Sequence, residues 1–119
     1  MSEERRKIGS YEIVRLLGKG GMSEVYEAEN PRLGSRHALK LFTYEKDDPE
    51  VKERFMVEGK LLARLNHPRI VKVTDFGTDE SSGKPYFVMD LVHILFLVCS
   101  HLDLHTHGEV CGSNLLVGF

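Results

Sequence analysis

The sequence lacks several features that would place it in other classes of protein. It has no apolar stretch of the roughly 18 residues that span a bilayer, and no apolar segment follows the charged residues 1–7 as in a secretory signal. Two cysteines in such a chain indicate a reducing, cytoplasmic setting without a disulfide framework. Sixteen Lys and Arg against eighteen Asp and Glu exclude a polybasic nucleic-acid binder. What remains is one small domain of 119 residues, or a piece of a larger one.

Basic residues are absent from the whole C-terminal part of the chain. All sixteen Lys and Arg lie at or before Lys84, whereas residues 85–119 hold both cysteines and four of the six histidines. We therefore place a composition boundary near residue 92 and expect a short irregular or helical tail over residues 93–119. The apolar run at 93–99 predicts self-association through this tail.

Before that boundary, the pattern predicts an α+β fold with five strands and one long helix. Asp48 and Pro49 favour a helix start, and apolar residues at helical spacing continue until Pro68, which disfavours helix in the residue before it. Short links between strands favour antiparallel pairing in a single sheet, and residues 1–10 are expected to be an N-terminal extension. The predicted strands cover residues 11–17, 24–29, 36–42, 70–76 and 86–91.

Three glycines, at positions 18, 20 and 21, lie between the first two predicted strands. Glycines let a hairpin approach a ligand closely, with backbone N–H groups free to meet phosphate oxygens. The segment does not open a helix, which disfavours a dinucleotide-binding fold. A plain turn is the alternative interpretation.

Two charged residues stand at positions meant for the core. Lys40 lies on a strand between apolar neighbours, and Glu58 lies on the apolar stripe of the helix. Lys40 on an edge strand could reach solvent, and Glu58 could pair with Arg54 one turn earlier. An ion pair between Lys40 and Glu58 would satisfy both charges at once, so the two features together favour it.

Five motifs in this order resemble the N-terminal lobe of a protein kinase, most closely the bacterial-type Ser/Thr kinases. The resemblance covers residues 11–92 and is specific because motif order and spacing both match. The motifs are the Gly-rich loop 18–26, His37-Ala38-Leu39-Lys40, Glu58, Asn66-His67-Pro68-x-Ile70-Val71 and Val88-Met89-Asp90-Leu91-Val92.

The resemblance implies Mg-ATP as the ligand and assigns a role to each matching position. Lys40 and Glu58 are the implied catalytic residues, with Lys40 pairing the α- and β-phosphates and Glu58 orienting it. Met89 would be the gatekeeper, and Ser23 replaces the third glycine of the strict loop pattern. The residues implied to bind nucleotide are Leu17, Gly18, Lys19, Gly20, Gly21, Met22, Ser23, Val25, Ala38, Lys40, Met89, Asp90 and Val92.

The chain departs from the family pattern after the hinge. Asp75-Phe76-Gly77 has the letters of the kinase metal-binding tripeptide but precedes the hinge, so we interpret Asp75 as a strand-end or turn residue. No catalytic loop follows, and residues 93–119 are interpreted as a truncated or corrupted remnant of the C-terminal lobe. No metal ligands are predicted, because the cysteines and histidines of the tail match no zinc spacing; they are Cys99, His101, His105, His107 and Cys111.

Two functions follow from this interpretation. The first is the ATP-binding lobe of a Ser/Thr kinase, whose family transfers the γ-phosphoryl of ATP to a protein hydroxyl. It would be inactive alone and would act on a protein substrate only with a C-terminal lobe supplied. The alternative is a non-enzymatic, pseudokinase-like interaction module.

Overall fold

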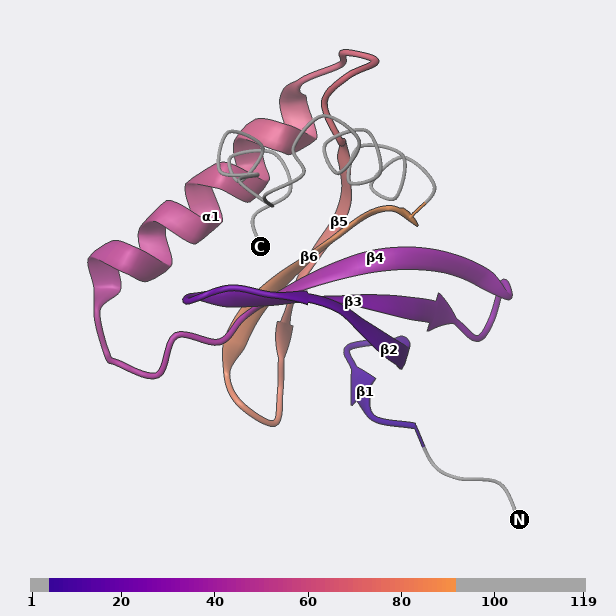
Figure 1. The fold of residues 1–119 in the computed structure, drawn as a ribbon, viewed down its shortest axis with the longest axis horizontal. Coiled ribbons are helices and arrows are strands. Elements are labelled where there is room, and N and C mark those ends of the chain that lie inside the picture. Colours follow the sequence, from indigo (N-terminus) through magenta and orange to yellow (C-terminus); the bar gives the residue numbers. More distant parts are fainter. Residues whose placement is uncertain (1–4, 92–119) are drawn as a thin grey trace, which may run out of the picture.

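The computed structural model describes residues 5–91, which fold as a curled antiparallel sheet with one helix (Figure 1). The sheet order is β1-β2-β3-β4-β6-β5, so the predicted antiparallel sheet and single helix are confirmed. Val92 and the predicted tail lie outside the described residues. The elements are β1 (Lys7–Ile8), β2 (Tyr11–Lys19), β3 (Ser23–Asn30), β4 (Ser35–Phe42), α1 (Pro49–Arg64), β5 (Val73–Asp79) and β6 (Lys84–Asp90).

The short strand β1 is the sixth strand, which the sequence pattern did not predict. Ile8 is fully buried and pairs with Tyr11 across a tight turn. Gly9 in that turn has a φ of 61°, and a Cβ there would lie 2.0 Å from the Tyr86 hydroxyl oxygen. Only glycine fits this position. Part of the expected N-terminal extension is therefore built into the sheet.

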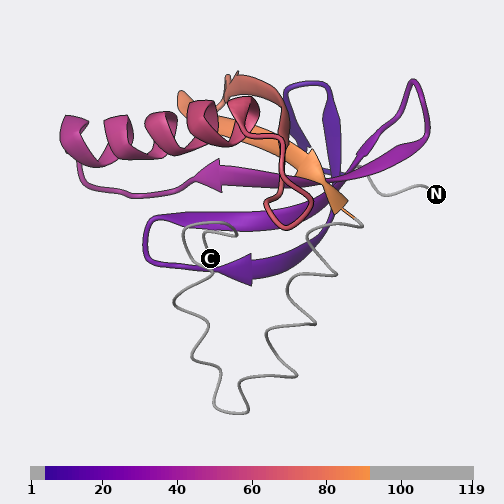
Figure 2. The same ribbon diagram turned by 90° about the horizontal axis from the view of Figure 1, so that it is seen from above.

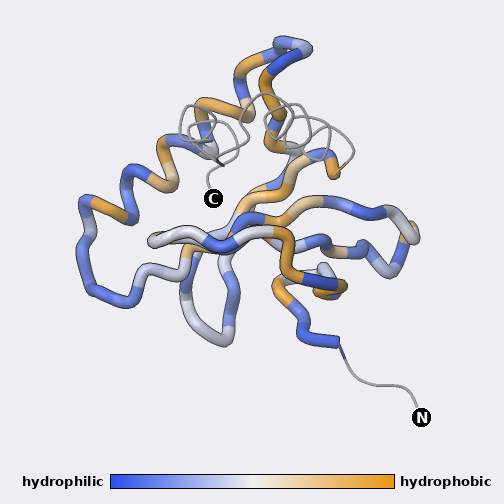
Figure 3. Tube along the Cα trace, in the orientation of Figure 1, coloured by the Kyte–Doolittle hydropathy of each residue, from blue (hydrophilic) through white to orange (hydrophobic). Residues whose placement is uncertain are grey.

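The sheet has a hydrophobic core on each face, and β4 contributes to both. Ala38 and Phe42 belong to the core beneath α1, whereas Leu39 and Leu41 belong to the opposite core. This alternation follows from the two-residue period of a strand. Figure 2 shows α1 lying along one face of the sheet. In Figure 3, the middle part of β6 is coloured as hydrophobic.

Helix α1 begins and ends where the sequence predicts. The Asp48 side chain accepts a hydrogen bond from the Glu50 backbone N–H at 3.0 Å, and Pro49 occupies the first turn. Helical geometry ends at Leu65, ahead of Pro68. Phe55, Gly59 and Leu62 form its buried face. Within residues 5–91, no helix is long and apolar enough to cross a membrane.

The fourth predicted strand is displaced along the chain, since β5 covers Val73–Asp79 instead of residues 70–76. The Ile70 N–H donates to the His67 carbonyl in a turn that contains Pro68, and β5 begins only after this turn. The strand continues through Gly77 to Asp79. A glycine fits there because a Cβ would lie 2.5 Å from the Tyr86 hydroxyl oxygen. Asp75 therefore lies within β5 beside a bulge, and its interpretation as a strand-end or turn residue was wrong.

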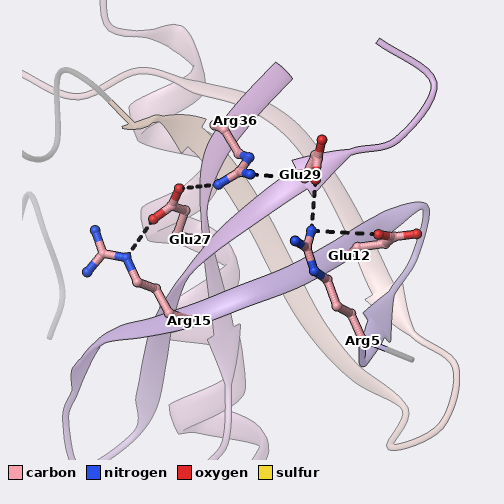
Figure 4. A network of polar contacts seen from close by, with 6 residues as sticks. All are labelled: Arg5, Glu12, Arg15, Glu27, Glu29 and Arg36. Atoms are coloured by element: carbon pink, nitrogen blue, oxygen red, sulfur yellow. Dashed lines mark hydrogen bonds and ion pairs between the residues drawn. The ribbon is translucent and has the colours of Figure 1, made fainter. Parts of the chain in front are cut away.

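A network of ion pairs joins β2, β3 and β4 (Figure 4). Glu27 is buried at its centre and accepts hydrogen bonds from Arg15 Nε and Arg36 Nη1, both at 2.7 Å. Burial raises the pKa of Glu27, but the two guanidinium groups outweigh burial and lower the pKa overall. Glu27 therefore stays ionised and holds three strands together.

Candidate functional site

Lys40 and Glu58 form the ion pair that the sequence predicts. Lys40 Nζ donates to Glu58 Oε1 at 3.0 Å, joining β4 to α1. The lysine side chain is almost completely buried, whereas a quarter of the Glu58 side chain is exposed. Among the described side chains, Glu58 pairs with Lys40 and not with Arg54. The alternative of a solvent-exposed lysine on an edge strand is excluded, because β4 lies between β3 and β6.

Two aromatic rings hold the lysine ammonium from the core side. Nζ lies 5.4 Å from the ring centroid of Phe87 and 5.6 Å from that of Phe55, within cation–π range. Burial lowers the pKa of Lys40, and the Glu58 carboxylate partly offsets this. Sequence reasoning missed both rings. Phe87 faces Lys40 in the β4–β6 register, which follows only once the pairing of those strands is known.

The Gly-rich segment forms the hairpin between β2 and β3. The Gly20 N–H bonds the Ser23 carbonyl at 2.8 Å and closes the turn. The Thr43 N–H bonds the Met22 carbonyl at 2.9 Å, which ties the hairpin tip to the chain just after β4. Among residues 5–91, no atom lies within 4 Å of a Cβ placed on Gly21, so nothing in the described part covers the tip there. A cavity of about 400 Å³ beside the tip is lined by Lys19, Gly20, Gly21, Glu24, Thr43, Tyr44, Glu45 and Lys46.

The apolar residues of the predicted site gather on the same sheet face as Lys40. Val25 faces Lys40 in the β3–β4 register, and Ala38 faces Met89 in the β4–β6 register. All three apolar residues are fully buried, and Leu17 packs against the same core. The pairing of β3 and β6 with β4 thus brings together residues that are far apart in the sequence. Asp90 ends β6 next to Met89, and Val92 lies beyond the described residues.

Asp75 lies away from this assembly. Its carboxylate accepts a hydrogen bond from the Tyr11 hydroxyl at 2.7 Å, on the side of the second core. Burial and this hydrogen bond raise the pKa of Tyr11, so the phenol remains the donor. Among residues 5–91, no group of three or more His, Cys, Asp or Glu could hold a metal ion. The structure therefore places no acidic metal site beside Lys40 within the described part.

Comparison with known proteins agrees with this geometry. The family model "Protein kinase domain" matches residues 11–107. Serine/threonine-protein kinase PknA of Mycobacterium tuberculosis is 44% identical over 89 residues, covering 71% of this chain and 21% of PknA. A probable serine/threonine-protein kinase of Streptomyces coelicolor, SCO3848, is 44% identical over 95 residues, covering 77% of this chain and 14% of that protein.

Solved structures show the same likeness in three dimensions. The crystal structure of the M. tuberculosis PknI kinase domain matches with a TM-score of 0.58 at 33% identity. The match covers 76% of this chain and 36% of that domain. The chain therefore spans about a fifth or less of the curated relatives named above and about a third of a solved kinase domain.

Proposed function

This chain belongs to the protein kinase family, and from that membership we propose that residues 11–92 are an ATP-binding lobe of the Ser/Thr type. One observation carries the proposal: the Lys40–Glu58 ion pair at 3.0 Å, in the same sheet whose strands β2 and β3 are joined by the Gly-rich hairpin. An ammonium held in a nearly dry site interacts strongly with phosphate oxygens, because the attraction between opposite charges is screened less at a low local dielectric constant.

The residues present fit ATP in three chemical respects. Lys40 supplies a buried cation for the α- and β-phosphates, and the open space around Gly21 lets a phosphate approach the backbone at the hairpin tip. Val25, Ala38 and Met89 are apolar side chains on the same sheet face as Lys40, which suits contact with a flat base once it is bound. When bound, Mg-ATP supplies the γ-phosphoryl group that the family transfers to a protein Ser or Thr hydroxyl.

Each residue then has one task. Glu58 holds the Lys40 ammonium at a fixed position, so the amine does not reorganise when phosphate arrives. The hairpin tip, tethered by Thr43, covers the triphosphate. The main chain near Asp90 and Val92 hydrogen-bonds the adenine edge. We further propose that these 119 residues bind nucleotide weakly and transfer no phosphoryl group by themselves, since the proton acceptor and metal ligands belong to a C-terminal lobe.

A melting experiment tests nucleotide binding. Ligand at about 100 times its dissociation constant stabilises a folded protein by about 2.7 kcal/mol, which corresponds to an upward shift of several degrees in Tm. We expect Mg-ATP to produce a shift of this kind at saturation, and Lys40→Ala to reduce it. Lys40→Met keeps the side-chain volume, and Lys72→Met on the exposed surface is the matched control. Equal shifts in Lys40→Met and Lys72→Met would contradict the proposal.

A specific feature also favours the second candidate, a non-enzymatic interaction module. A cavity of about 510 Å³ runs along α1, and two of its apolar lining residues, Val57 and Leu61, are about half exposed. Exposed apolar patches of this kind mark interaction surfaces. Absence of any nucleotide-induced Tm shift in the unmodified chain would favour this function over the first.

A further inference from the structure

Helix α1 lies close against the sheet at Gly59, the residue after Glu58. A Cβ built on Gly59 would lie 2.5 Å from Phe76 Cε2, and 2.8 Å and 3.2 Å from Phe87 Cδ2 and Cε2. Carbon atoms in protein interiors pack at about 3.5–4.0 Å, so no side chain fits there without movement. The helix backbone therefore lies directly against two aromatic rings.

Of these two rings, Phe87 is the one that cannot yield easily. It is fully buried, its centroid lies 4.9 Å from that of Phe55, and Lys40 Nζ stands over it at 5.4 Å. Phe76 is only partly buried, at the margin of the same core. A larger residue at position 59 thus pushes against the same ring that supports the Lys40 ammonium.

The ion pair tolerates little displacement of the helix. Restoring an ordinary contact to Phe87 needs a retreat of about 1 Å. Taken along the line of the ion pair, that retreat stretches the 3.0 Å separation of Lys40 Nζ and Glu58 Oε1 to about 4 Å, the outer limit of an ion pair. Because Glu58 is the adjacent residue on the same rigid helix, it moves with Gly59.

We propose that Gly59 is a positioning residue: its missing side chain sets the distance from helix to sheet at which Glu58 reaches Lys40. The geometric part stands on the contacts alone, and its consequence for nucleotide binding rests on the proposed function. Gly59 itself is not proposed to contact the nucleotide. It acts only through the ion pair.

A double-mutant cycle measures the ion pair directly. Urea unfolding of the full chain, Lys40→Met, Glu58→Gln and the double variant gives the coupling between the two charges. The same cycle is repeated in the Gly59→Val background, and again with Ala63→Val, which adds bulk to an exposed position of the same helix. We expect the coupling to vanish with Gly59→Val and to persist with Ala63→Val. Gly59→Ala, a milder change that raises helix propensity, serves if Gly59→Val does not fold.

The outcomes separate this inference from the proposed function. If Gly59 were merely structural, Gly59→Val would lower the stability of all four proteins equally and leave the coupling intact, which would overturn the inference. With the coupling lost, Mg-ATP affinity is expected to fall roughly tenfold, the cost of losing one hydrogen bond to a charged group. Lost coupling in a chain that never binds nucleotide would support Gly59 as a positioning residue and reject the ATP-binding lobe.

Discussion

At the scale of single residues, two of the buried charged side chains among residues 5–91, Lys40 and Glu27, are held in different ways. Lys40 has one partner and two aromatic rings, and its lowered pKa shows that burial outweighs the Glu58 attraction. Glu27 has two guanidinium partners, and its pKa is lowered because these outweigh burial. Both buried charges are paired, as buried charges in folded proteins are expected to be. Burial therefore disfavours the charged form of Lys40, whereas the arginine partners favour the charged form of Glu27.

The lowered pKa of Glu27 makes stability depend on acid. A carboxyl whose folded pKa lies below its unfolded value of 4.5 contributes stability above that value and loses it as pH falls through the folded pKa. We expect Glu27→Gln to lower the free energy of unfolding at pH 7 by about 1–2 kcal/mol, and to flatten its decline below pH 4.5. Urea titrations at several pH values measure this. An unchanged acid profile would show that Glu27 is not the group responsible.

At the scale of elements, α1 is the part that most directly connects sequence to site. Its first turn depends on Asp48, while Asp47 beside it is exposed and has no capping bond. Asp48→Ala is expected to destabilise the protein by about 1 kcal/mol, the usual cost of losing an N-cap. Asp47→Ala is the matched control and should change little. Chemical denaturation compares the two, and equal effects would contradict the role of Asp48.

The sequence could predict the helix and the ion pair, but not the exact strands or the aromatic support. Asp48, Pro49 and Pro68 act locally, and Lys40 and Glu58 are charges at apolar positions, which the period of each element reveals. The strand β5 continues through Gly77, where the Tyr86 side chain of the neighbouring strand fills the space of a Cβ, and the sequence pattern does not reveal this contact. Phe55 and Phe87 look like ordinary core residues until the helix is packed on the sheet. The role of Gly59 could not be predicted either, because its contacts with Phe76 and Phe87 exist only once the helix is packed on the sheet.

At the scale of the whole molecule, the groups proposed to position nucleotide have no cluster of metal-ligating side chains beside them within residues 5–91. We expect the 119-residue chain to show no phosphoryl transfer to a generic protein substrate. Missing general-base catalysis alone costs about 10² to 10⁴ in rate, and missing metal ligands add to this. A radiolabelled-phosphate assay decides the matter. Transfer above background that disappears in Lys40→Ala would show that the chain carries its own catalytic groups.

The exposed apolar surface of α1 predicts association between molecules. Light scattering should report a mass that rises with concentration, and Leu61→Lys should reduce the rise by placing a charge on the groove. Leu16→Lys is the matched control, since Leu16 on β2 is exposed to a similar degree. A constant monomer mass at high concentration would contradict this expectation.

The alternation along β4 also limits how the gene could change. A deletion of one residue ahead of Lys40 would turn every later side chain of that strand to the other face of the sheet. The lysine would then point into the core formed by Ile8 and Tyr11, and a leucine would face Glu58. Losing two residues would return the lysine to its own face, one step along the ladder. In β4, the parity of a length change thus matters more than its size.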